Sequence, residues 1–179
     1  MLYYLLLHSE FYNLFEKSVK LTIDKIISLG HEIGLHFDPS FYGIKSKFEL
    51  EKYIEFEKQI LEKVFDFKIK SFSFHNPTED ILKYDDFYYS GLINTYSKEI
   101  KENINYCSDS NGYWRFKRMF DVVDKEKPSK LQILTHPVWW TREVMSPKDK
   151  VWYAIDNKSE SNKSFYIESM GSYNRKIIT

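Results

Sequence analysis

The chain of 179 residues has one cysteine, no net charge and no long hydrophobic run. The single cysteine, Cys107, excludes an internal disulfide and fits a reducing compartment. Basic and acidic residues balance at 26 each and form no basic stripe, which argues against nucleic acid as the main partner. No apolar segment approaches the length that spans a membrane. These absences exclude disulfide scaffolds and argue against nucleic-acid binders and membrane-spanning proteins.

The opening residues MLYYLLLHSE contain a short apolar run, but they have no basic leader and charge follows at once. They therefore do not predict a signal peptide, and we expect a cytoplasmic protein. The length favours one domain over residues 1–179. Aromatic residues make up 18% of the chain, which reflects either a biased overall composition or a surface for stacking on sugars or bases.

Hydrophobic patterning predicts strands that alternate with helices in the first half of the chain. A buried strand over residues 3–8 is followed by helical spacing over 11–30, with Gly30 as its stop. A second strand covers 32–37. Ser46 and Glu49 then have capping-box spacing and open a helix that runs to about residue 65. The apolar stripe expected on this helix consists of Phe48, Tyr53, Phe56, Ile60, Leu61 and Val64.

Four more strands follow, over residues 70–75, 92–96, 103–110 and 130–136. Ser146 and Pro147 then open a weaker helical segment over 147–166, within a C-terminal helical extension at 147–179. Alternating strands and helices with polar residues at strand ends are typical of a parallel sheet with crossover helices. The sequence therefore predicts an α/β fold with its functional groups beyond the carboxyl ends of the strands.

Titratable side chains gather at those predicted strand ends. The candidates are His36, Asp38, His75, Asp109 and His136. Imidazole nitrogen and carboxylate oxygen suit zinc and similar divalent ions, which makes the first three candidate metal ligands. A single histidine is more often a satisfied core or surface group, and that reading stays open for each of them. His31 precedes a strand and is expected to bond locally.

The last of these strands delivers His136 into a loop that Pro137 opens. A histidine there can protonate a leaving group, because its unperturbed pKa lies near neutrality. Trp139 and Trp140 follow, and either stack on a sugar ring or belong to the core. Around the turn-forming Asn-Gly at 111–112 lie Asp109, Trp114 and Arg115, where the aspartate can orient a histidine or an arginine; a plain polar turn is the alternative.

Four ordered stretches, GHEIGLH, SFSFHNP, SDSNGYW and ILTHP, resemble the polysaccharide deacetylase (NodB-homology) family over about residues 3–140. The resemblance implies a distorted (β/α) barrel and a divalent metal, most simply zinc, that acts on the acetyl carbonyl of a carbohydrate. On this mapping His36 corresponds to the first histidine ligand and His136 to the late-strand acid. Asp109 and Trp114 correspond to a groove motif whose aspartate orients its neighbours and whose tryptophan lines the pocket.

The sequence departs from the family pattern at three places. The second histidine ligand falls on Ser40, so that Asp38 or His75 has to substitute. His75-Asn76-Pro77 stands where the family has arginine and proline. The family's paired aspartates lie on a strand that precedes residue 3, which predicts an incomplete barrel that lacks the first strand and has impaired turnover. A barrel of this kind exposes a sheet edge, and this favours homo-oligomers.

Three functions compete on this evidence. The first is a metal-dependent carbohydrate deacetylase acting on N- or O-linked acetyl groups. The second is a non-catalytic deacetylase-like domain that binds saccharide or a partner protein. The third is another metal-dependent hydrolase, such as a phosphoesterase. The first requires His36 and His136 to share one mouth of the sheet.

Overall fold

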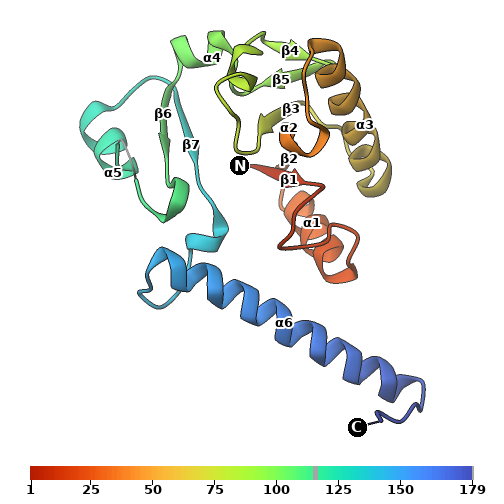
Figure 1. Cartoon of the computed structure of the whole chain (residues 1–179). Helices are drawn as coiled ribbons and strands as arrows, with labels where there is room; N and C mark the ends of the chain where they lie inside the picture. The colour runs from red at the N-terminus through yellow and green to blue at the C-terminus, as the bar shows by residue number, and fades with distance from the viewer. Residues whose placement is uncertain (115–116, 179) are drawn as a thin grey trace. The chain divides into compact units, whose positions relative to one another are not determined.

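The computed structural model describes residues 1–114 and 117–178 and divides the chain into two compact units (Figure 1). Unit 1 is Met1–Ile104 and unit 2 is Asn105–Thr179; each is described by itself. Within the described residues, no helix combines the length and apolarity needed to cross a bilayer. The prediction of one domain over residues 1–179 stays a prediction.

Unit 1 is built on a five-stranded sheet in the order β1-β2-β3-β5-β4. The strands are β1 (Leu2–Leu6), β2 (Glu32–Phe37), β3 (Ser71–Phe74), β5 (Leu92–Asn94) and β4 (Tyr88–Tyr89). The first four in the sheet run parallel, and β4 pairs antiparallel to β5. This confirms the predicted α/β class with a parallel sheet. Closure into a barrel stays a prediction.

The two faces of this sheet differ in polarity. Because side chains alternate along a strand, Leu35 and Phe37 of β2 point to the face opposite that of His36. Both apolar side chains are fully buried, in one cluster with Phe72 and Phe74 of β3. On the other face, the Tyr4 hydroxyl lies 3.1 Å from Ser71 Oγ. One face of the sheet therefore builds the core, and the other carries hydroxyl and imidazole groups.

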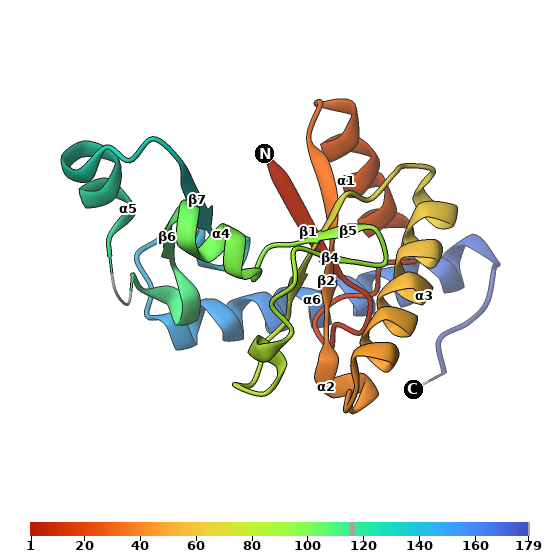
Figure 2. The same ribbon diagram turned by 90° about the horizontal axis from the view of Figure 1, so that it is seen from above.

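Helices α1 (Lys17–Ser28) and α3 (Lys47–Phe65) both pack on β2, on the same side of the sheet (Figure 2). The capping box is confirmed, since Ser46 Oγ accepts from the Glu49 N–H and Glu49 Oε2 accepts from Ser46 Oγ and the Lys45 N–H. The short helix α2 (Pro39–Tyr42) lies between β2 and α3 along the chain. The other helices of unit 1 are η1 (Ile81–Lys83) and α4 (Lys98–Asn103).

The predicted start of the first helix was wrong by six residues, because α1 begins at Lys17. In the segment before it, Ser9 Oγ accepts from the Phe11 N–H and Asn13 Oδ1 accepts from the Phe15 N–H. Such local side-chain bonds offer the backbone an alternative to helix. Phe11 and Phe15, which fitted the helical spacing, are 62% and 58% exposed.

The predicted stripe on the second helix was also largely wrong. Phe48 and Phe56 are 76% and 52% exposed, and Val64 is 38% exposed. The buried residues of α3 are Leu50, Ile54, Glu57, Leu61 and Phe65. This set has helical spacing, but a glutamate stands at its centre. Because a glutamate occupies the middle of the buried face, a search for hydrophobic residues alone did not identify that face.

Unit 2 contains a two-stranded parallel ribbon, β6 (Asn105–Ser108) and β7 (Leu131–Leu134). The connection holds η2 (Ser110–Gly112), α5 (Met119–Asp121) and η3 (Val122–Glu126), and η4 (Pro137–Trp139) follows β7. The last helix, α6 (Pro147–Ser172), confirms the helix predicted over 147–166 and continues past it, but it ends short of residue 179, the predicted end of the helical extension. Ser146 caps it by accepting from the Asp149 N–H, as the Ser-Pro signal predicts.

Candidate functional site

Two predicted site residues, His36 and His75, meet at the carboxyl ends of β2 and β3. The ladder continues one residue past β3, where the His75 N–H donates to the Phe37 carbonyl over 2.7 Å. This brings His75 Nδ1 to 3.2 Å from His36 Nε2, with the two rings nearly perpendicular. The sequence placed both histidines at neighbouring strand ends, and the structure brings them together.

A backbone hydrogen bond fixes which nitrogen of His36 carries the proton. His36 Nδ1 lies 3.2 Å from the Ser73 carbonyl oxygen, which can only accept, so this nitrogen holds the proton. The lone pair of His36 then sits on Nε2, facing His75. An imidazole held by a backbone carbonyl in this way is the usual arrangement behind a metal-binding nitrogen. His36 is therefore oriented with its Nε2 toward a possible ligand site.

The separation of these nitrogens suits two ligands of one ion. Nitrogens about 2.0–2.1 Å from a tetrahedral zinc lie roughly 3.3 Å apart, against the 3.2 Å between His36 Nε2 and His75 Nδ1. The separation therefore matches two ligands of one zinc ion, provided that His75 Nδ1 gives up the proton with which it bonds to His36. Among residues 1–114 and 117–178, however, no set of three or more histidine, cysteine or acidic side chains is placed to hold an ion.

The remaining predicted metal ligand, Asp38, begins α2. Its Oδ1 accepts from the Ser40 N–H at 2.9 Å and from the Phe41 N–H at 3.3 Å, so the carboxylate caps this short helix. Capping explains an aspartate at this position without any metal. Its role as a ligand stays a prediction.

In unit 2, Asp109 and His136 form a closely bonded pair at the carboxyl ends of β6 and β7. Asp109 Oδ1 lies 2.7 Å from His136 Nδ1, and both carboxylate oxygens lie 3.1 Å from the His136 backbone N–H. Asp109 is 6% exposed, whereas the His136 side chain is 39% exposed. A carboxylate oxygen can only accept a hydrogen bond, so in a neutral His136 the proton is on Nδ1. The opposite nitrogen, Nε2, then carries the lone pair and is the reactive one.

The predicted sugar-contacting residues have different surroundings. Trp140 is 56% exposed, which leaves much of its ring open to a ligand. Trp139 and Trp114 are half-buried, and the Trp139 indole N–H is buried without a hydrogen-bond partner among the described residues. A Cβ on Gly112 would lie 3.4 Å from the Trp139 ring and 2.7 Å from Pro147, so η2 packs closely there. The prediction for Arg115 falls outside the described residues.

His36 and His136 belong to different units, and each unit is described by itself. The expectation that both imidazoles open on one mouth therefore stays a prediction. Within each unit the expected pairing is present: two histidines in unit 1, and an aspartate with a histidine in unit 2.

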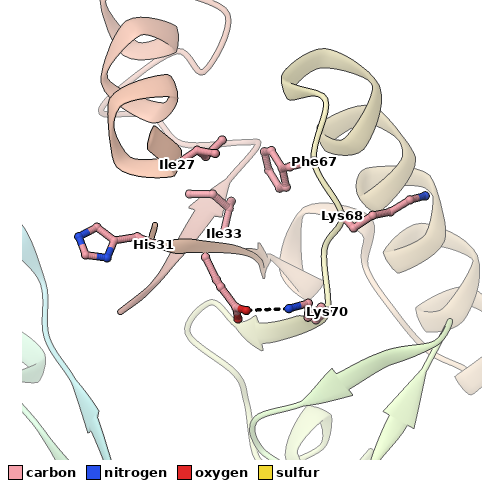
Figure 3. Close-up of a pocket in the computed structure, with 7 residues that line it drawn as sticks. Ile27, His31, Ile33, Phe67, Lys68 and Lys70 are labelled. Atoms are coloured by element: carbon pink, nitrogen blue, oxygen red, sulfur yellow. Dashed lines mark hydrogen bonds and ion pairs between the residues drawn. The ribbon is translucent and has the colours of Figure 1, made fainter. Parts of the chain in front are cut away.

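A shallow pocket in unit 1 lies at the opposite, amino end of the strands (Figure 3). Ile27, Ile33 and Phe67 give it an apolar wall, and Glu32 and Lys70 form an ion pair of 2.7 Å at its rim. His31 also lines it, and its backbone N–H donates to the Ile26 carbonyl, as local bonding predicts. The pocket contains none of the predicted site residues.

Sequence reasoning missed a second polar cluster at the carboxyl edge of unit 1. His8 Nε2 lies 3.0 Å from Glu57 Oε1 and 3.0 Å from the Tyr42 hydroxyl. His8 follows the first strand, so the rule that selected the other strand-end histidines also applies to it. Glu57 gave no signal, because a glutamate in a helix rich in Glu and Lys is typical of a solvated face.

Comparison with protein-family models, with curated proteins and with solved structures gave no match. The resemblance to polysaccharide deacetylases therefore rests on the sequence motifs alone. The functional argument depends on the residues themselves: the His36–His75 pair, the Asp109–His136 pair, and the partners that orient them.

Proposed function

We propose that this chain is a metal-dependent hydrolase that removes N- or O-linked acetyl groups from a carbohydrate. The observation that carries the proposal is the Asp109–His136 pair, with its 2.7 Å contact between Oδ1 and Nδ1. This pair lies where the family resemblance assigns the late-strand acid and the aspartate that orients its neighbours.

The pair has the geometry of an acid–base group. Asp109 is buried and holds both the ring and the backbone N–H of His136. The carboxylate stabilises the imidazolium that forms when His136 takes up a proton, and it keeps Nε2 turned away from Nδ1 and available. From Nε2, His136 can donate that proton to the departing sugar oxygen or amine. Without the proton, that oxygen or amine would be a poor leaving group.

In unit 1, His36 and His75 are the residues that would hold a divalent ion, most simply zinc. When bound, such an ion supplies Lewis acidity toward the acetyl carbonyl. The bond from His36 Nδ1 to the Ser73 carbonyl serves this purpose by keeping the lone pair on Nε2. Asp38 is the nearest acidic residue along the chain to complete the ligand set.

The proposed substrate is a carbohydrate, because the aromatic side chains assigned to contact it suit sugar rings. Trp140 is the most exposed of them, and the apolar face of a sugar stacks well on an indole ring. Trp114 and Trp139 offer smaller exposed surfaces. Arg115 completes the proposed contacts.

Acetate release tests the proposal directly. The purified chain is incubated with acetylated oligosaccharides, with added zinc and after chelation, and bound metal is measured in the same samples. We expect zinc-dependent acetate release that His136→Ala reduces. Absence of both bound metal and acetate release would overturn the proposal, and turnover of a phosphate ester alone would favour a phosphoesterase.

A second function is favoured by the ligand set, because the described residues supply two close histidines and no third ligand beside them. On this alternative the chain is a non-catalytic domain that binds saccharide or a partner protein. Saccharide affinity would then survive chelation and His136→Ala, and would fall on Trp114→Ala.

We further propose a cytoplasmic location and self-association through β1. The single cysteine fits a reducing compartment. Among the described residues, β2 is the one strand that pairs with β1, so β1 is an edge of the sheet in unit 1, and edge strands favour pairing with another chain. Size-exclusion chromatography tests the association, and a monomer at all concentrations would contradict it.

A further inference from the structure

Helix α3 carries a carboxylate at a position that the fold otherwise reserves for apolar side chains. Glu57 is fully buried, between Ile54 and Leu61 in the buried stripe. Its polar neighbours among the described residues are the His8 imidazole, 3.0 Å from Oε1, and the Tyr42 hydroxyl, which hydrogen-bonds to the carboxyl group. Burying a carboxyl group in an apolar core is unfavourable, whereas a leucine there would stabilise the core. A buried carboxyl group held beside an imidazole and a phenol hydroxyl calls for a specific role.

The group that Glu57 faces is the His8 ring, which is fixed on three sides. Nε2 lies 3.0 Å from Glu57 Oε1 and 3.0 Å from the Tyr42 hydroxyl. The Phe41 ring stacks on the imidazole at a centroid distance of 3.5 Å and an angle of 7°. The His8 side chain is 24% exposed, and no hydrogen bond from a described residue occupies Nδ1. Nδ1 is therefore the ring nitrogen that these contacts leave open.

The position of His8 in the fold brings it to the same edge of the sheet as the proposed metal ligands. β1 pairs with β2 in a register that sets Leu6 opposite His36, and His8 follows two residues later. Burial lowers the pKa of His8 and raises that of Glu57; the negative charge of Asp38 opposes the first shift and adds to the second, so all three groups lie within electrostatic reach. Adjacent parallel strands thus deliver His8, His36 and His75 to one edge.

Burial reverses the usual order of basicity in this pair. It raises the pKa of Glu57 to about 7, an effect that the nearby Tyr42 hydroxyl partly offsets, and it lowers the pKa of His8. The pKa of Tyr42 is raised by its own burial and by Glu57, and Tyr53 stacks on its ring at 4.1 Å. A proton delivered to His8 therefore finds a better acceptor in Glu57, and the pair stays free of separated charge.

We propose that His8 is a proton-accepting catalytic residue of the unit 1 site and that Glu57 is its positioning residue and final proton acceptor. The proposal rests on the hydrolase function proposed above. A water molecule loses a proton to His8 Nδ1, the proton on Nε2 passes to Glu57 Oε1, and the water oxygen bonds to the acetyl carbonyl. The negative charge moves from Glu57 to the carbonyl oxygen, so protons and charge balance.

Acetate release as a function of pH is the decisive experiment. An acetylated chito-oligosaccharide serves as the probe, and rates are measured from about pH 5 to about pH 9 for the full chain and its variants. We expect His8→Gln to lower kcat by roughly 10²–10⁴-fold. Glu57→Gln should lower kcat by about 10- to 100-fold with little change in KM, and should move the acid limb of the profile below its wild-type position. Glu55→Gln, on the same helix but paired with Lys58 at 3.1 Å, is the matched control and should change neither.

Nuclear magnetic resonance of the wild-type chain provides a readout that needs no turnover. Carboxyl-¹³C and imidazole-¹⁵N shifts should show Glu57 titrating near 7 and His8 titrating below its usual value. Titration of both groups at ordinary values would overturn the proposal even if Glu57→Gln fails to fold. So would folded His8→Gln and Glu57→Gln variants whose rates stay within about threefold of wild type with an unchanged pH profile.

The outcomes separate this inference from the function on which it rests. A wild-type chain that releases no acetate overturns the hydrolase function, and the catalytic role of His8 with it. A wild-type chain that releases acetate, together with variants that are unaffected, overturns the role of His8 and Glu57 alone. Acetate release that His8→Gln abolishes and Glu55→Gln leaves unchanged supports both.

Discussion

The two units of this chain use histidines at parallel strand ends but surround them differently. In unit 1, His36 is held by a backbone carbonyl and faces a second histidine. In unit 2, His136 is held by the buried carboxylate of Asp109. A histidine that donates to a neutral carbonyl oxygen stays neutral and can give its other nitrogen to a metal. A histidine that donates to a carboxylate is more easily protonated to the imidazolium. The partner, more than the histidine, decides which chemistry each end can perform.

The units also differ in how their frames are stabilised. The buried apolar cluster lies wholly in unit 1, under α1 and α3. In the described part of unit 2, Cys107 and Val122 are the buried apolar residues, and α6 buries none. The Asp109–His136 pair therefore depends on the β6–β7 ladder and on its own hydrogen bonds more than on a packed core. The histidine pair of unit 1 and the Asp109–His136 pair of unit 2 can each be tested separately.

The largest effect is expected from breaking the pair in unit 2. Asp109→Asn keeps the shape of the side chain but removes the charge that stabilises a protonated His136. We expect acetate release to fall by roughly 10²–10⁴-fold, as for the loss of a general acid or base. Asp124→Asn in η3 is a control that changes the same type of residue away from the pair. Unchanged turnover in folded Asp109→Asn would show that the pair is structural.

The next effect is expected in unit 1 and concerns metal rather than protons. His36→Ala and His75→Ala should each weaken zinc binding by more than about 100-fold, because each removes one of two adjacent nitrogen donors. Calorimetry with zinc alone measures this. His31→Ala, at the amino end of the same strand, should bind zinc like wild type, and so should Asp109→Asn. Equal zinc affinity in His36→Ala and wild type would show that the histidine pair of unit 1 does not bind metal.

The sequence alone was sufficient where local signals agree with the final packing. The strand at 32–37, the capping box at Ser46 and the cap at Ser146 all appear as predicted, because each depends on neighbours within a few residues. Strand ends placed His36 beside His75 because parallel strands share an edge. These features need no knowledge of the tertiary structure.

The sequence was insufficient where tertiary contacts override the local pattern. The face of α3 was misassigned because Glu57 occupies a core position and exposed Phe48 and Phe56 imitate one. Gly34 looks unremarkable in the sequence, yet a Cβ there would lie 2.5 Å from the Tyr4 ring across the strand pair. The residue types at these positions are determined by contacts with residues distant in the chain, and the hydrophobic periodicity does not reveal such contacts.

A smaller effect, on stability, should distinguish the buried carboxyl group of Glu57 in unit 1 from the buried carboxylate of Asp109 in unit 2, which is paired with a histidine. Burial raises the pKa of Glu57 from 4.5 to about 7, so the folded protein keeps a proton that the unfolded chain releases in this range. Stability is therefore lost as the pH rises from about 4.5 to about 7. Glu57→Gln should unfold less readily than wild type above pH 7, by at most on the order of 3 kcal/mol, and the difference should vanish below about pH 4.

Urea denaturation of both proteins across this range measures that difference. The lowered pKa of His8 acts in the opposite direction, and Glu57→Gln also changes the surroundings of His8, so His8 is titrated in both proteins and its contribution is subtracted. Glu55→Gln, which removes an exposed carboxylate, should follow the wild-type curve. A pH-independent difference between Glu57→Gln and wild type would show that the carboxyl titrates normally.

The smallest effect is expected at the exposed aromatic surface of unit 2. Trp140→Ala should weaken the affinity for saccharide by about two- to tenfold, which corresponds to about 0.5–1.5 kcal/mol for one stacking contact. Binding of an unacetylated oligosaccharide, followed by calorimetry with and without a chelator, separates this contribution from the metal. Trp152→Ala on α6, where the side chain is equally open at 55% exposed, is the matched control. If Trp152→Ala weakens binding as much as Trp140→Ala does, exposed aromatic area alone explains the affinity, and the loop after β7 has no special part in binding sugar.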